Sequence, residues 1–170
     1  TFSYGVSVGG GPFAGAIGLR PKTPRRAANE LLAQWKNDGV EDFVIITGHR
    51  FEPHLEALLM ALTATSSNSV YDLCQIHVAD VLESNPAFEH GGELETSLLP
   101  HLAPKLVHME EAEEYLLEER SPRRYTRGRV PTPPAKSRGV GGYPRLGTKE
   151  KGRVVFDRYL DSIAQALTSD

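Results

Sequence analysis

The chain has 170 residues, of which 39% are hydrophobic and 24% are charged, and we expect one globular domain spanning residues 1–170. The formal net charge of −3 gives no general attraction to nucleic acid, which excludes a protein that coats DNA or RNA through charge alone. No apolar run approaches the roughly 20 residues that a membrane helix needs, so we also exclude a membrane-spanning protein.

The cysteine content indicates the redox compartment. Cys74 is the single cysteine, so the chain cannot form an intrachain disulfide. This fits a reducing compartment, and we expect a cytoplasmic protein in which Cys74 is an inert core thiol.

The first predicted elements are a loop and a helix. The first twelve residues are rich in glycine, whose missing side chain permits unusual backbone angles, and they predict a loop. For the helix that follows we expect Thr23 as N-cap, Pro24 at the first helical position and Gly39 at the end. Its apolar stripe consists of Ala27, Ala28, Leu31, Leu32 and Trp35.

Strands then alternate with helices. The continuous β-branched run at 42–47 predicts a strand covered on both faces. A helix at about 51–65 and a strand at 70–77 follow it. Strand, helix and strand at such short spacing are typical of a βαβ unit with a parallel sheet, so we predict an α/β fold.

The second half of the chain is less regular. We predict a short helix at 93–102, ended by Pro104, and an acidic helix at 109–120. Residues 121–142 are rich in proline and arginine and predict a long surface loop. A final helix is expected at about 148–167.

His49 is the first candidate for chemistry. It lies two residues beyond the predicted strand and directly after Gly48, which lets the chain turn. Ligands of parallel α/β sheets bind at the carboxyl ends of strands, so a metal-binding or acid–base histidine fits there. A loop histidine with satisfied hydrogen bonds remains the alternative.

The segment 89–97 holds the densest group of candidate residues. Gly91 and Gly92 allow the backbone to approach a ligand, and three carboxylates with one histidine can bind a divalent cation. On a helix Glu93 and Glu95 diverge by about 200°, so only one of them can point inward. The alternative is a helix start whose acidic first turn interacts favourably with the helix dipole.

Four segments match, in chain order, the pattern of one known family. Residues 89–107 resemble its His-(Ala/Gly)-Gly-x-x-Glu-Thr-Ser segment with the following Pro-x-Leu-Val, and 46–49 resemble its Asn-Gly-His turn. Residues 7–20 resemble a Gly-rich stretch that ends in Phe-Pro-Gly-Thr, and 139–152 resemble a closing signature. Together they resemble the creatininase family of metal amidohydrolases.

The resemblance implies a fold and a reaction class. The expected fold is a three-layer α/β/α arrangement with a mostly parallel sheet, here lacking the first β–α unit. The expected activity is hydrolysis of amide or cyclic amide C–N bonds in small substrates at a site with two zinc or manganese ions. Members of the family also tend to form hexamers, and we expect an oligomer here.

The resemblance also assigns roles to residues. His49 and Glu95 match metal ligands, and His90 matches a histidine that contacts substrate and helps with proton transfer. These roles agree with general chemistry, because metal ions generate nucleophilic water near neutral pH and imidazole can carry the proton. The remaining positions that we expect to bind substrate are Arg50, Gly91 and Gly92.

The sequence departs from the family pattern in several places. The family's first strand ends in Glu-x-His followed by an Asp, and the 170 residues contain no counterpart of that segment. Thr47 replaces the asparagine of the turn, and Phe51 stands where the family has glycine or a residue that can bind metal. The Phe-Pro-Gly-Thr loop has lost its proline and its threonine.

These departures leave three interpretations open. A second polypeptide supplies the missing ligands, the chain is a fragment of a longer enzyme, or it is a catalytically inactive structural subunit of a hetero-oligomer. A phosphate or nucleotide site at Gly9, Gly10 and Gly11 is disfavoured, because the glycines lack the spacing of the known phosphate-binding loops.

Overall fold

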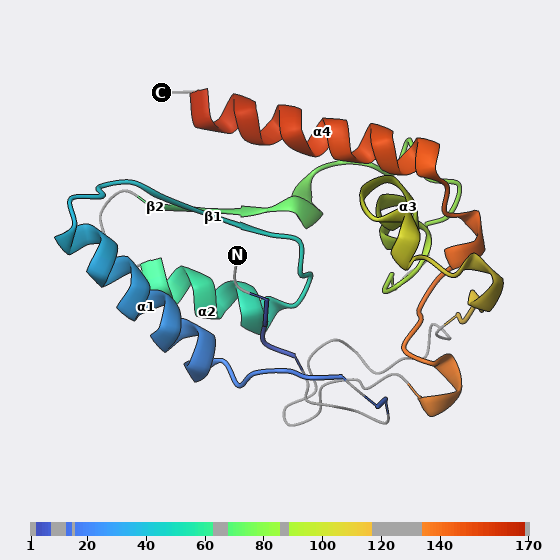
Figure 1. The fold of residues 1–170 in the computed structure, drawn as a ribbon, viewed down its shortest axis with the longest axis horizontal. Helices are drawn as coiled ribbons and strands as arrows, with labels where there is room; N and C mark the ends of the chain where they lie inside the picture. The colour runs from blue at the N-terminus through green and yellow to red at the C-terminus, as the bar shows by residue number, and fades with distance from the viewer. Residues whose placement is uncertain are drawn as a thin grey trace. The chain divides into compact units, whose positions relative to one another are not determined.

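The computed structural model describes residues 3–7, 13–14, 16–62, 68–85, 89–116 and 134–168 (Figure 1). The chain divides into two compact units, Thr1–Ile76 and His77–Asp170. The first unit alternates helices with two parallel strands, and the described part of the second contains two α-helices and several short 3₁₀ turns. The predicted α/β class is confirmed, whereas the prediction of a single domain stays a prediction.

Helix α1, Lys22–Asn37, starts earlier than the sequence suggested. Pro21 occupies the N-cap position without a side-chain cap, and Thr23 lies inside the helix, so the prediction of Thr23 as N-cap was wrong. The proline ring fixes φ at a helical value, −51° for Pro21. The helix can therefore begin before Thr23.

The end of α1 is as predicted. Gly39 adopts a φ of 92°, which favours glycine over residues with a side chain. Its N–H donates to the Lys36 carbonyl, and the N–H of Val40 donates to the Trp35 carbonyl, each at 3.0 Å. This pair of bonds is the Schellman motif that ends many helices.

The sheet of the first unit has two strands. Strand β1, Phe43–Thr47, pairs in parallel with β2, Asn68–Asp72, and helix α2, Glu52–Leu62, connects them. Figure 1 shows α1 and α2 on the same side of this sheet. Their shared core consists of Leu32, Phe43 and Leu62, with Ile45 and Val70 packed against it.

The prediction that the first strand is covered on both faces was wrong for part of β1. Phe43 and Thr47 are buried, whereas Val44 and Ile46 are 42% and 50% exposed. Successive side chains of a strand point to opposite faces, and both helices of this unit lie on one of them. The run of apolar residues concealed this alternation.

Strand β2 is shorter than the predicted strand at 70–77. It ends at Asp72, whose carboxylate accepts the N–H of Cys74 at 3.0 Å and caps a 3₁₀ turn, Leu73–Gln75. Cys74 is therefore half-buried in a turn, with its thiol 3.5 Å from the Gly48 carbonyl oxygen, and not in the core of a strand.

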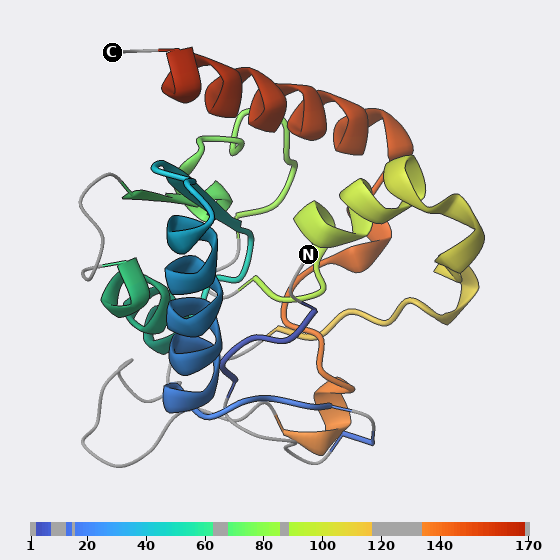
Figure 2. The same cartoon turned by 60° about the vertical axis from the view of Figure 1, so that its left-hand side comes forward.

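In the second unit, helix α3, Glu93–Leu102, packs against helix α4, Lys149–Thr168 (Figure 2). The predicted helix at 93–102 is confirmed at both ends, and Pro104 begins a separate 3₁₀ turn, as its helix-ending role requires. The predicted final helix is confirmed to within one residue at each end.

The acidic helix predicted at 109–120 was wrong in the part that the structure describes. A 3₁₀ turn, Met109–Glu111, is followed by extended chain, in which Tyr115 pairs with Gly142. The run carries many like charges and few apolar residues, so helix formation would bury little and repel neighbouring carboxylates. Residues 117–133, which include most of the predicted loop at 121–142, lie outside the described residues.

Within the described ranges, no helix is both long enough and apolar enough to cross a bilayer.

Candidate functional site

The densest group of candidate residues surrounds the start of α3. His90 pairs with Gly141 in an antiparallel bridge, with N–H···O distances of 2.8 and 2.7 Å. Gly91 then takes a φ of 59°, which favours glycine, and Gly92 becomes the N-cap of the helix. The two glycines therefore form the turn that the sequence predicted, and they open α3 directly after the candidate catalytic histidine.

Glu89 takes the place of a capping side chain at this turn. Its Oε1 accepts the N–H of Leu94 at 3.0 Å, which compensates for the missing side chain of Gly92. A Cβ at Gly92 or Gly142 would approach this carboxylate to 2.5 or 2.6 Å. Its Oε2 is buried without a hydrogen-bond partner among the described residues. Burial raises the pKa of the Glu89 carboxyl, although the bond from Leu94 acts to lower it.

Glu93 and Glu95 diverge as the helical geometry predicted. Glu93 is fully buried, whereas Glu95 is exposed. The Oε2 of Glu95 accepts the N–H of Gly91, which lies one residue before the N-cap that a capping box would engage. A carboxylate can cap with one oxygen and bind a cation with the other, so the assignment of Glu95 as a metal ligand stays a prediction.

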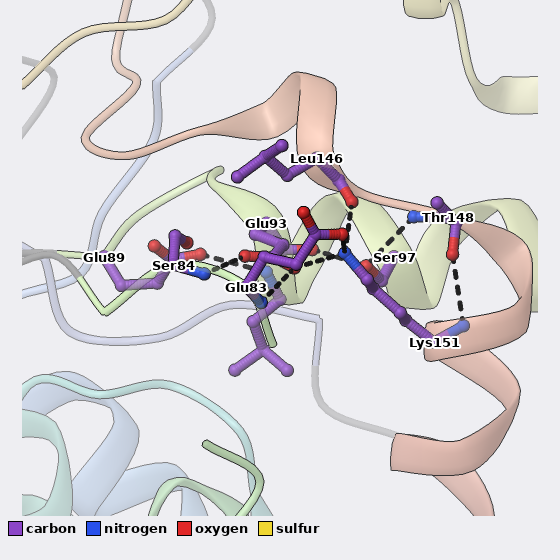
Figure 3. Close-up of polar contacts among 9 residues, drawn as sticks. Glu83, Ser84, Glu89, Glu93, Ser97, Leu146, Thr148 and Lys151 are labelled. Carbon is purple, nitrogen blue, oxygen red and sulfur yellow. Dashed lines mark hydrogen bonds and ion pairs between the residues drawn. The ribbon is translucent and has the colours of Figure 1, made fainter. Parts of the chain in front are cut away.

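Glu93 lies at the centre of a polar cluster that sequence reasoning missed (Figure 3). Its Oε1 accepts the Glu83 N–H at 2.9 Å and lies 2.6 Å from the Lys151 ammonium, and its Oε2 accepts the Ser84 N–H at 2.8 Å. The ammonium also contacts the Glu83 carboxylate at 2.6 Å and the Leu146 carbonyl at 2.9 Å. Burial would raise the pKa of Glu93, but the bonds from Lys151, Ser84 and Glu83 outweigh it and keep that pKa below its ordinary value.

A second contact joins α3 to α4. The hydroxyl of Ser97 donates to the Glu93 carbonyl at 2.7 Å and accepts the N–H of Thr148 at 3.2 Å. Gly152 lies so close to Ser97 that an added Cβ would overlap the Ser97 carbonyl oxygen. The two helices therefore meet through a buried hydroxyl and a glycine, and both belong to segments that carried the family resemblance.

In the first unit, His49 directly follows the turn after β1. Its backbone N–H donates to the Thr47 hydroxyl at 3.2 Å, and its Nε2 lies 2.8 Å from the Val6 carbonyl oxygen. The side chain is half-buried. The position beyond the strand is thus the one predicted, and one ring nitrogen already has a backbone partner.

His54, in the first turn of α2, is a second histidine at this place, and sequence reasoning missed it. Its ring lies 5.0 Å from the His49 ring, centroid to centroid. His54 Nδ1 accepts the Val6 N–H, and His54 Nε2 bonds the Thr47 hydroxyl, both at 3.2 Å. Its position in the first turn of the helix that follows His49 was the available signal.

The structure groups the predicted site residues by unit. Four of them gather at the start of α3 in the second unit: His90, Gly91, Gly92 and Glu95. The other two, His49 and the exposed Arg50, follow β1 in the first unit. Within the part of the chain that the structure describes, no three His, Cys, Asp or Glu side chains form a group that could hold a metal ion.

Comparison with known protein families gives one match. The family model for creatininase, described as creatinine amidohydrolase, matches residues 1–167. The chain belongs to the creatininase family. The resemblance inferred from four sequence segments is thereby confirmed. A search of curated proteins finds no match to this creatininase-family chain.

Solved structures share the fold. A mutant creatininase has a TM-score of 0.77 and 22% identity, covering 96% of this chain and 71% of its own. A mutant creatininase complexed with creatine gives 0.76 at 22% identity, and a manganese creatininase gives 0.75 at 21%, with the same coverage. At this identity the likeness establishes the creatininase-like fold, in agreement with the predicted α/β architecture.

Proposed function

We propose that this creatininase-family chain is part of a metal-dependent amidohydrolase that cleaves an amide or cyclic amide C–N bond in a small substrate. The observation that carries the proposal is the match of the family model to residues 1–167, because it runs through both groups of candidate residues.

The proposed metal ligands in this chain are His49 and Glu95. The bond from His49 Nε2 to the Val6 carbonyl supports the first, because metal-binding histidines commonly donate their other ring N–H to such a group. The exposed carboxylate of Glu95 supports the second. Similar solved proteins are described as a Zn–Zn creatininase and a manganese creatininase, so zinc and manganese are the cations to test.

Two ligands are too few for a catalytic zinc, which normally has at least three from protein. The described residues offer no larger group of metal-binding side chains. We therefore propose that the other ligands come from polypeptide outside these 170 residues, either in the same protein or in a partner. Bound zinc or manganese would polarise the substrate carbonyl and make water nucleophilic near neutral pH.

The residues at the start of α3 are proposed to act on the substrate. The imidazole of His90 would carry a proton between water and the leaving nitrogen, as histidine does in general acid–base catalysis. Gly91 and Gly92 let the backbone approach a small molecule closely, because neither has a side chain. Arg50, exposed after β1, would bind a polar group of the substrate.

A catalytically inactive subunit is the alternative, and one observation favours it. The Thr47 hydroxyl, which replaces the asparagine of the family's turn, is held in hydrogen bonds to His49 and His54. A structural network of this kind could preserve the fold after catalysis was lost.

Metal analysis of the purified protein, in its native assembly, distinguishes the two functions. We expect stoichiometric zinc or manganese that is lost in His49→Ala and retained in the control His108→Ala. His108 is a suitable control because its side chain is 65% exposed and pairs only with Glu110 among the described residues. A folded, metal-free protein would contradict the hydrolase and support the inactive subunit, and native mass measurement would show whether a second polypeptide is present.

A further inference from the structure

Four hydrogen bonds in the first unit form a closed circuit through two histidines. They join the His49 N–H to Thr47, Thr47 to the His54 ring, the His54 ring to Val6, and Val6 to the His49 ring. We propose that His54 is a positioning residue: through Val6 it holds His49 in the Nε2–H tautomer, so that Nδ1 is the nitrogen that binds a cation. The metal part of this inference rests on the proposed function.

The first step locates the proton of His49. A backbone carbonyl oxygen can only accept a hydrogen bond. Since His49 Nε2 lies 2.8 Å from the Val6 carbonyl oxygen, Nε2 must carry the hydrogen. In a neutral imidazole the other nitrogen, Nδ1, then has the free lone pair that a metal ion requires.

The second step locates the proton of His54 by the opposite argument. The Val6 N–H can only donate, so His54 Nδ1 is the acceptor in their 3.2 Å contact and carries no hydrogen. The proton of the neutral ring is therefore on Nε2, which donates to the Thr47 hydroxyl at 3.2 Å. Both imidazoles are therefore in the Nε2–H tautomer, with Nδ1 bare of hydrogen.

The third step explains why the arrangement is fixed. Val6 is 1% exposed, and Thr47 and His54 are each 8% exposed, so water cannot easily replace these partners. Val6 is hydrogen-bonded on both sides: its N–H donates to the His54 ring, and its carbonyl accepts from the His49 ring.

His49 itself is less enclosed than its partners. Its side chain is half-buried, and its Nδ1 has no hydrogen-bond partner among the described residues. At metal sites, a backbone carbonyl commonly accepts the other ring N–H of a metal-binding histidine and so fixes its tautomer and orientation. The geometry therefore prepares Nδ1, and not Nε2, for coordination.

The test is nitrogen NMR on the full protein in its native assembly, with ¹⁵N-labelled histidine. At about pH 8, where an ordinary histidine is neutral, long-range ¹H–¹⁵N correlations distinguish the two tautomers. We expect His49 to be in the Nε2–H form. In His54→Phe, which lacks both ring nitrogens, we expect a mixture of tautomers, whereas His54→Gln, which can still accept from Val6 and donate to Thr47, should restore the single form.

Cadmium-113 then reports the coordinating nitrogen. Coupling from cadmium to His49 Nδ1 would support the proposal, and coupling to Nε2 would overturn it. An Nδ1–H tautomer of His49, or a His54→Phe protein that is folded and keeps one tautomer, would also overturn it. Complete absence of cadmium binding, with the expected tautomer present, would overturn the metal part and the proposed function while supporting the assigned protonation of His49.

Discussion

Glu93 is a fully buried carboxylate, and its environment explains how a charge is tolerated there. Both of its oxygens accept backbone N–H groups, and the Lys151 ammonium lies 2.6 Å away. An ionised carboxylate is costly to bury unless it is paired and hydrogen-bonded in this way. Because its partners come from the chain before α3 and from α4, Glu93 holds the start of α3, and with it the turn at Gly91, in place.

Glu93→Gln and Glu83→Gln form a matched pair for testing this role. Both carboxylates lie 2.6 Å from the Lys151 ammonium, but Glu93 is fully buried and the Glu83 side chain is 67% exposed. We expect Glu93→Gln to lower the free energy of unfolding by about 3–5 kcal/mol, since it removes one partner of a buried pair. Glu83→Gln should cost less than about 1 kcal/mol, as exposed pairs do. Urea unfolding measures both, and equal losses would contradict the argument.

The same pair predicts the direction of the pH dependence. The pKa of Glu93 is lower in the folded protein than its ordinary value of 4.5, so the folded state favours the charged form. Its contribution to stability is therefore fully present above about pH 4.5 and is lost as pH falls through the folded pKa. The stability difference between wild type and Glu93→Gln should shrink below pH 4.5, whereas a constant difference would show that charge is not the cause.

At the residue scale, the sequence predicted where a residue lies in its element better than which residues it contacts. It located His49 beyond a strand, and it predicted that only one of Glu93 and Glu95 points inward. Which of the two is buried depends on Lys151, 58 residues further along the chain, and no local pattern contains that information. His54 was missed for the same reason, because its contact with Val6 spans 48 residues.

At the scale of elements, the sequence predicted what local chemistry decides. The start of α3 and the end of α1 follow from glycines with positive φ, the end of α3 follows from Pro104, and all three were predicted correctly. The exposed face of β1 and the absent helix at 109–120 were not predictable in this way. Both depend on what packs against the segment, and an apolar or acidic run does not specify its neighbours.

Gly152 shows how tertiary packing reverses a local preference. In an exposed helix, replacing glycine by alanine stabilises the protein by about 1 kcal/mol. At Gly152, however, the new Cβ would overlap the Ser97 carbonyl oxygen on α3. We expect Gly152→Ala to destabilise the protein by about 1–3 kcal/mol, the usual cost of overpacking, as measured by urea unfolding.

The exposed position Ala164 on the same helix provides the control. Ala164→Gly should destabilise the protein by about 1 kcal/mol, because a helix ordinarily favours alanine over glycine by that amount. A stabilising effect of Gly152→Ala, similar in size to that preference, would mean that α3 and α4 do not approach as closely as described.

At the scale of the whole molecule, the match of the chain to one family must be reconciled with its division into two compact units. The family model runs without interruption from residue 1 to residue 167, across the boundary between Ile76 and His77. A family that is inherited as one sequence unit suggests one cooperative domain, which is also what the chain length predicted. The candidate residues are divided between the units, so the proposed function depends on this question.

Cooperative unfolding provides the test, because one of its probes reports on a single unit. Trp35, the single tryptophan, stacks on Phe43 in the first unit, and its fluorescence reports on that unit. Far-UV circular dichroism reports on the helices of both units, α1 and α2 in the first and α3 and α4 in the second. If the chain is one domain, Glu93→Gln in the second unit should move the Trp35 transition to lower urea by the same amount as the dichroism transition. A Trp35 transition that stays in place while part of the dichroism signal is lost at lower urea would mean two independent domains. In that case His49 and Glu95 would not be held together by the fold of this chain.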